Sequence, residues 1–169
     1  MWNDTDEPIA FLITFRTHGT WLHGDDRGSI NRFHNKYGTE RIRPEPKWLA
    51  INQQRLSREP TILNARQRAT VRKAIIETCK FRQWALPAVN VRTNHAHAVV
   101  GAPYKAPSLV LNALKANATR LMRERGVWLS NLSPWSDKGS TRYLWTEKHV
   151  ILASNYVEFG QGEDLPEFD

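Results

Sequence analysis

Residues 93–100, Thr-Asn-His-Ala-His-Ala-Val-Val, constrain the fold more than any other segment of the chain. An apolar run of this kind is typical of a buried strand, and side chains on a strand alternate between its two faces. His95 and His97 therefore point to the same face. At about 3.3 Å per residue their Cα atoms lie roughly 6.6 Å apart, close enough for both imidazoles to reach one ion. The segment predicts half of a metal site, although taken alone a His-x-His pair fits two ordinary structural histidines equally well.

Seven segments carry the hydrophobic periodicity of strands or helices. The expected strands are residues 9–16, 86–92, 95–101 and 142–145, and the expected helices are residues 64–84, 107–126 and 146–159. The order favours an α+β fold in which helices cover a mainly antiparallel sheet, formed by a single domain over residues 1–169. Within it, residues 19–60 are rich in glycine, proline and charge, which predicts a long loop-rich insertion, and residues 163–169 form a tail.

Local signals mark the ends of the helices. Pro107 is suited to the first turn of a helix and Gly126 to the position just after its end, while Thr146 can cap the last helix. In the helix at 64–84 the apolar stripe leaves Arg68 and Lys73 among the positions expected to face outward.

The chain is basic, with 24 Lys and Arg against 17 Asp and Glu and a net charge of +7. A surplus of this size favours a polyanionic partner, for which nucleic acid is the natural candidate. Seven Trp, four Tyr and six Phe add rings that can stack on unpaired bases. A basic protein with no nucleic-acid role has the same composition, so charge alone leaves both interpretations open.

A single cysteine, Cys79, excludes an intrachain disulfide and a cysteine-based zinc cluster. The acidic start of the chain lacks the features of a signal peptide, and no apolar stretch approaches the roughly 18 residues that span a membrane. We therefore expect a cytoplasmic protein with no membrane partner.

Tyr156 is set apart from the apolar stripe of the last helix. Val150, Ala153 and Val157 belong to that stripe, and at about 100° per residue Tyr156 lies roughly 120° from its centre. A partly exposed structural tyrosine would look the same. Beside a histidine pair on a basic protein, however, a displaced tyrosine fits DNA strand cleavage by a phenol nucleophile. The histidines would hold a divalent cation on the scissile phosphate, which assists attack on a phosphorus whose leaving group is poor.

These motifs resemble those of a known family, the IS200-type transposases with one catalytic tyrosine, and more closely their relatives associated with repetitive extragenic palindromes (REP). The resemblance runs from the strand at Phe11 to Gly162. It rests on Thr-Phe-Arg followed by Gly-Thr-Trp-Leu, on Asn-His-Ala-His, on the basic helix that follows, and on Tyr-Val-Glu-Phe-Gly-Gln-Gly. The His-hydrophobe-His element is the hallmark of the family.

The resemblance implies a ferredoxin-like fold, Mg²⁺ or Mn²⁺ as cofactor, and single-stranded or hairpin DNA as substrate. His95 and His97 would be metal ligands, and Tyr156 would form a 5′-phosphotyrosine bond. It also implies a homodimer in which the tyrosine helix can act in trans by completing the partner's site. Two imidazoles suit Mn²⁺ better than Mg²⁺, which prefers oxygen ligands, so the ion used stays open.

A third ligand in the family is commonly a Gln or Asn about one turn after the tyrosine. It maps here to Gln161, with Glu158 as the alternative, and Gln161 can reach the ion if the helix ends at Gly160. Asn94 and His149 are candidates for supporting contacts to the ligands.

Basic side chains would hold DNA phosphates. The candidates are Arg16, Lys73, Lys115, Arg120 and Arg123. Two other functions stay open besides a nicking and rejoining enzyme: an inactive or domesticated relative that binds hairpin DNA without cutting it, and a metal-dependent hydrolase that uses water as nucleophile.

Overall fold

The computed structural model describes residues 6–20, 59–163 and 165. Almost all of the predicted insertion at residues 19–60, and most of the predicted tail at 163–169, lie outside these residues.

Four antiparallel strands form the sheet. They are β1 (Ala10–Arg16), β2 (Ala85–Val91), β3 (His95–Gly101) and β4 (Ser140–Leu144), in the order β2-β3-β1-β4. The hairpin of β2 and β3 is as predicted, and β4 begins two residues earlier than predicted. The strands β1 and β3 occupy the two central positions, so residues on them are held from both sides by hydrogen-bonded neighbours.

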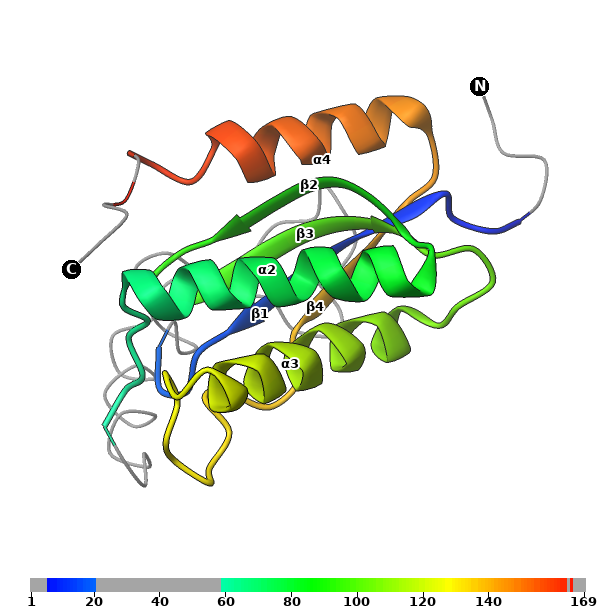
Figure 1. Cartoon of the computed structure of the whole chain (residues 1–169). Coiled ribbons are helices and arrows are strands. Elements are labelled where there is room, and N and C mark those ends of the chain that lie inside the picture. Colours follow the sequence, from blue (N-terminus) through cyan, green and yellow to red (C-terminus); the bar gives the residue numbers. More distant parts are fainter. Residues whose placement is uncertain (1–5, 21–58, 164, 166–169) are drawn as a thin grey trace.

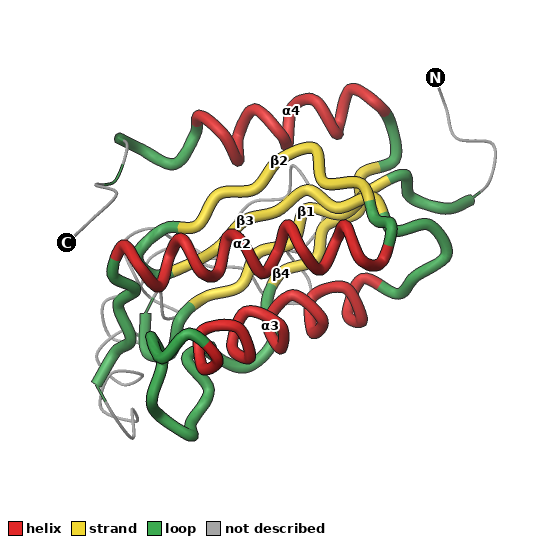
Figure 2. The backbone as a smooth tube through the Cα atoms, viewed as in Figure 1, coloured by secondary structure: helices red, strands yellow, loops and turns green. Residues whose placement is uncertain are grey.

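Three helices complete the described structure. They are α2 (Ala65–Arg82), α3 (Pro107–Glu124) and α4 (Glu147–Phe159). Helices α2 and α3 lie side by side on one face of the sheet, and α4 lies on the other face beside β2 (Figures 1 and 2). The order β1-α2-β2-β3-α3-β4 with this strand order is the ferredoxin-like arrangement, to which α4 is added. The predicted α+β, ferredoxin-like fold is confirmed.

The helix ends follow the local signals in the sequence. Asn64 and Gln67 form a reciprocal capping box at the start of α2. Pro107 opens α3, and the Thr146 side chain accepts a hydrogen bond from the backbone of His149 at the start of α4. Gly126, with φ +69°, follows the end of α3 as predicted.

Two hydrophobic clusters lie on the two faces of the sheet. The larger cluster joins alternate residues of β1 and β3 to α2 and α3. Its fully buried members include Phe15, Ile75, Val100, Leu114 and Met122. The smaller cluster lies under α4. Its buried members are Ala10, Leu12, Ala88, Val99, Leu144, Ala153 and Val157. The period of two along the strands therefore assigns successive side chains to different cores.

One outward position of α2 was predicted wrongly. Arg68 is 6% exposed, and its guanidinium donates a hydrogen bond of 2.9 Å to the backbone oxygen of Leu63. The long side chain folds back over the start of the helix, where a buried carbonyl needs a donor, and periodicity alone does not reveal such a partner.

None of the three described helices combines the length and the apolar composition that a membrane span requires.

Candidate active site

Strand β3 presents both histidines on the face of the sheet that α4 occupies. Within the sheet, His97 is paired with Thr14 of β1 and Asn90 of β2, and His95 is paired with Arg16. The two imidazole rings lie 4.6 Å apart between centroids at an interplanar angle of 72°. His97 is 1% exposed, whereas His95 is half-buried. The pair therefore combines one imidazole inside the protein with one that solvent or a ligand can reach.

Each histidine has an oxygen partner at Nδ1. The Nδ1 atom of His95 lies 2.7 Å from Oδ1 of Asn94, and that of His97 lies 2.7 Å from Oγ1 of Thr14. An amide oxygen only accepts hydrogen bonds, so the contact with Asn94 forms when His95 donates from Nδ1, and in the neutral ring Nε2 then carries the lone pair. This tautomer is the one that ligates a metal through Nε2.

Gln161 meets His95 just after the end of α4. Its Nε2 donates a hydrogen bond of 3.0 Å to the backbone oxygen of Tyr156, which turns Oε1 the other way. That Oε1 lies 3.1 Å from Nε2 of His95. When the His95 proton is on Nδ1, Nε2 of His95 and Oε1 of Gln161 are both acceptors. Two acceptors lie this close when they share a cation between them or when the ring carries a second proton on Nε2.

The donor set fits a divalent cation. Two ligands at right angles around an ion, each bonded at about 2.1 Å, are roughly 3.0 Å apart, which agrees with the separation between His95 and Gln161. No group of three His, Cys, Asp or Glu suited to a metal occurs in the parts of the chain that are described, so among those residues a third ligand beside the histidines would be of another type. The amide oxygen of Gln161 is of that type. Glu158, the alternative ligand, is exposed on α4.

Tyr156 reaches the histidines within the same chain. Its ring centroid lies 5.6 Å from that of His97, in an edge-on arrangement at 64°. The side chain is half-buried and packs against the smaller hydrophobic cluster. A tyrosine 120° off the apolar stripe therefore still faces the sheet, because α4 lies over β2 and β3, where its flank meets the histidines. His149, by contrast, lies in the first turn of α4, about two turns away.

Polar contacts from β2 and from the residue just after it hold the end of α4 and the segment that follows. The Asn90 side chain donates a hydrogen bond of 2.9 Å to the backbone oxygen of Val157, and the Arg92 guanidinium donates one of 2.7 Å to that of Glu163. Gly160 closes the helix with a hydrogen bond of 2.9 Å from its N–H to the Tyr156 oxygen. A Cβ at position 160 would lie 2.7 Å from that oxygen and 2.9 Å from Cδ2 of the Tyr156 ring, so only glycine allows this close approach.

Two of the predicted DNA contacts lie near the ends of β1 and β4. Arg16 is half-buried on the histidine face at the end of β1. Lys115 of α3 donates from Nζ to the backbone oxygens of Ser136 and Lys138, at 2.9 and 2.8 Å. Burial lowers the pKa of the Lys115 ammonium; the Asp137 carboxylate opposes this shift and Arg16 adds to it.

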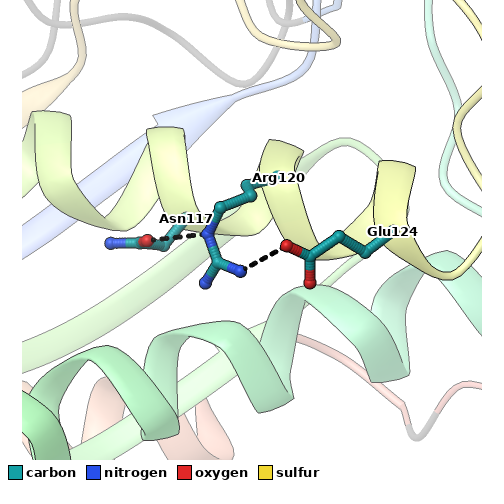
Figure 3. Close-up of polar contacts among 3 residues, drawn as sticks. All are labelled: Asn117, Arg120 and Glu124. Carbon is teal, nitrogen blue, oxygen red and sulfur yellow. Dashed lines mark hydrogen bonds and ion pairs between the residues drawn. The ribbon is translucent and has the colours of Figure 1, made fainter.

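The other three predicted DNA contacts lie on α2 and α3, across the sheet from α4. Arg120 bonds Asn117 and pairs with Glu124 at 2.8 Å along one side of α3 (Figure 3). Arg123 donates to the backbone of the loop after α3, at Ser130 and Leu132. Lys73 pairs with Glu77 at 3.7 Å. These three side chains are not gathered around the histidines, and their contact with DNA stays a prediction.

Thr14 and Asn90 were not singled out from the sequence. Thr14 has the right parity on its strand to share a face with the histidines, but only the register between β1 and β3 puts it opposite His97. No comparable signal identifies Asn90, because its partner is a backbone oxygen 67 residues later.

Comparison with known proteins finds a family that matches most of the chain. The family described as "Transposase IS200 like" matches residues 55–158, which include both histidines and Tyr156 and end before Gln161. No curated protein matches the chain. Among solved structures, a REP-associated tyrosine transposase bound to a REP hairpin is similar, with 14% sequence identity and a TM-score of 0.47. That match covers 93% of this chain and 67% of the other.

Proposed function

The chain belongs to the IS200-like transposase family, and we propose that it cleaves and rejoins single-stranded DNA beside hairpins through a covalent bond to Tyr156. The observation that carries the proposal is the meeting of two distant segments of the sequence, the histidine pair and the end of α4 with the residues just after it. The ring of Tyr156 contacts His97, and the next histidine on that face, His95, meets Gln161 at 3.1 Å.

His95, His97 and Gln161 would hold Mg²⁺ or Mn²⁺. Binding of the cation there would polarise the scissile phosphate and offset the charge that develops on it. The mixed imidazole and amide set favours Mn²⁺ over Mg²⁺.

In the proposed reaction, the phenolic oxygen of Tyr156 attacks the phosphorus and the bond from phosphorus to the 3′ oxygen breaks. The phenol loses its proton to solvent, and the departing 3′ oxygen gains one. The products are a 5′-phosphotyrosine and a free 3′-hydroxyl, so no external energy source is needed for the reverse attack that rejoins a strand.

The contact between Tyr156 and His97 in one chain supports a site assembled in cis. Asn90 and Arg92 supply the polar contacts that hold this end of α4 against the sheet of its own chain. The homodimer, and a tyrosine that acts in trans, stay predictions of the family resemblance.

The test is incubation of the full chain with a hairpin oligonucleotide carrying single-stranded flanks, in Mn²⁺ or Mg²⁺, followed by a denaturing gel. We expect a protein band shifted by attached DNA. Tyr156→Phe should abolish the band, a loss of about 10³-fold or more, because it removes the nucleophile and little else. Tyr143→Phe, a change on β4, is the matched control and should keep the band.

Two outcomes would overturn the proposal. Binding of the oligonucleotide with no adduct from the wild-type chain, in either ion, indicates a DNA-binding protein without cleavage. Cut DNA with no attached protein, from both the wild type and Tyr156→Phe, indicates a hydrolase that uses water.

A further inference from the structure

We propose that Thr14 is a positioning residue that holds His97 in the tautomer able to bind the metal. The inference rests on the proposed function, since it concerns one of the two histidines expected to ligate the cation. Thr14 lies on β1, whereas the proposed ligands lie on β3 and just after α4.

The contact between Thr14 and His97 is short and partly buried. Oγ1 of Thr14 lies 2.7 Å from Nδ1 of His97, which is 1% exposed. The two residues are direct partners across β1 and β3, the central strands of the sheet. On its other side Thr14 is paired with Ser140 of β4, and a Cβ at Gly139 would come within 2.6 Å of the Thr14 carbonyl oxygen. The backbone of Thr14 is therefore held between β3 and β4, and the hydroxyl is carried on that fixed backbone beside His97.

A threonine hydroxyl can donate or accept, so the contact is compatible with two tautomers of His97. If Thr14 donates, Nδ1 carries the lone pair, Nε2 carries the proton, and Nε2 cannot bind a metal. If Thr14 accepts, Nδ1 carries the proton and Nε2 carries the lone pair through which an imidazole ligates a metal. A hydrogen bond at one ring nitrogen is the usual device that sets which nitrogen meets the metal.

The neighbouring histidine decides between the two. Asn94 presents an amide oxygen to Nδ1 of His95, which requires a proton on that Nδ1. Only the same tautomer at His97 gives both imidazoles an Nε2 lone pair for one ion. Thr14 therefore accepts from His97 as Asn94 accepts from His95, and the two oxygen partners act as a matched pair.

The first experiment observes the tautomer directly in the metal-free chain. With ¹⁵N-labelled histidine, NMR distinguishes an imidazole protonated at Nδ1 from one protonated at Nε2. We expect the neutral His97 to be protonated at Nδ1 in the wild type and in Thr14→Ser, which keeps the hydroxyl. Thr14→Val, which has the same shape but no hydroxyl, should shift His97 toward the other tautomer.

The second experiment measures Mn²⁺ affinity by electron paramagnetic resonance, without DNA. Thr14→Val should weaken Mn²⁺ binding about 10- to 100-fold, the usual cost of losing a partner of a metal-bound histidine. Thr14→Ser should stay close to the wild type. Thr141→Val, which alters a half-buried threonine of β4 on the other face of the sheet, is the matched control and should leave Mn²⁺ binding unchanged.

Several results would overturn the inference. A proton on Nε2 of His97 in the wild type contradicts it, and so does tighter Mn²⁺ binding by Thr14→Val, which is expected if Thr14 donates. Unchanged Mn²⁺ affinity in a folded Thr14→Val, or no Mn²⁺ binding by the wild type, also contradicts it. A wild type that binds Mn²⁺ with the expected tautomer but forms no DNA adduct contradicts the proposed function and leaves the role of Thr14 intact.

Discussion

The two faces of the central sheet differ in what they bury. On the face covered by α2 and α3, alternate residues of β1 and β3 are apolar throughout and join the larger hydrophobic cluster. On the face covered by α4, the same strands carry Leu12 and Val99 toward one end and Thr14, His95 and His97 toward the other. Because successive strand residues belong to different faces, the polar groups of the site lie on the α4 face and do not interrupt the apolar packing of the larger cluster on the other face. Stability and chemistry are thereby largely separated across a single layer of backbone.

The substitution with the largest expected effect tests the stability of the α2 and α3 face. Leu114 of α3 is fully buried there, and Leu114→Ala should lower the free energy of unfolding by about 2–5 kcal/mol, through lost apolar burial and a residual cavity. Urea denaturation measures this change. At a temperature where the variant stays folded, its adduct formation should match that of the wild type. A parallel loss of activity would show that the two faces are coupled.

A second test uses the buried thiol of the same face. Cys79 of α2 is 1% exposed, and burial raises its pKa from the ordinary value of 9.0 to about 11. The native state then holds the proton more tightly than the unfolded state. The resulting stabilisation is complete below pH 9 and should be lost as the pH rises from about 9 to 11, by about 2–3 kcal/mol in total. Denaturation curves for the wild type and Cys79→Ala at several alkaline pH values measure the difference, and equal slopes for the two proteins would contradict the prediction.

A pair of glycine substitutions compares the site with a turn on the other side of the molecule. Gly160→Ala places a methyl group 2.9 Å from the Tyr156 ring, and the displaced tyrosine should form adduct about 10- to 100-fold more slowly. The control is Gly126→Ala, where nothing lies within 4 Å but φ is +69°. It should cost about 1–2 kcal/mol of stability through strain and leave the adduct rate unchanged. Similar adduct rates for the two variants would remove Gly160 from the set of positioning residues.

The pair of substitutions with the smallest expected effect compares one arginine on each face of the sheet. If DNA follows the histidine face, Arg16→Gln should weaken binding of a single-stranded oligonucleotide several-fold and reduce the slope of log affinity against log salt by about 0.7–1. Arg120→Gln, on the face away from the histidines, should weaken DNA binding less than Arg16→Gln does, and loss of its exposed pairing with Glu124 should change stability by less than about 0.5 kcal/mol. Fluorescence anisotropy over a range of salt concentrations measures both variants. An equal loss in the two would show that DNA also crosses α3.

Local pattern was enough to place most of the elements. The cap at Thr146, the helix start at Pro107, the turn at Gly126 and the β2-β3 hairpin depend on a few neighbouring residues, so the sequence predicts them well. Arg68 shows the limit of such reasoning, because its burial depends on a carbonyl that periodicity does not describe.

The sequence by itself determined that His95 and His97 share one face of a strand, since a period of two is a property of extended backbone, and that Tyr156 stands off the apolar stripe of its helix. Tertiary structure alone decided that this helix crosses the sheet beside the histidines, that Gln161 turns back toward His95, and that Thr14 lies against His97. The physical reason is separation along the chain. Contacts between residues 66 or 83 positions apart depend on strand register and helix packing, which arise from the burial of the whole core rather than from any local pattern.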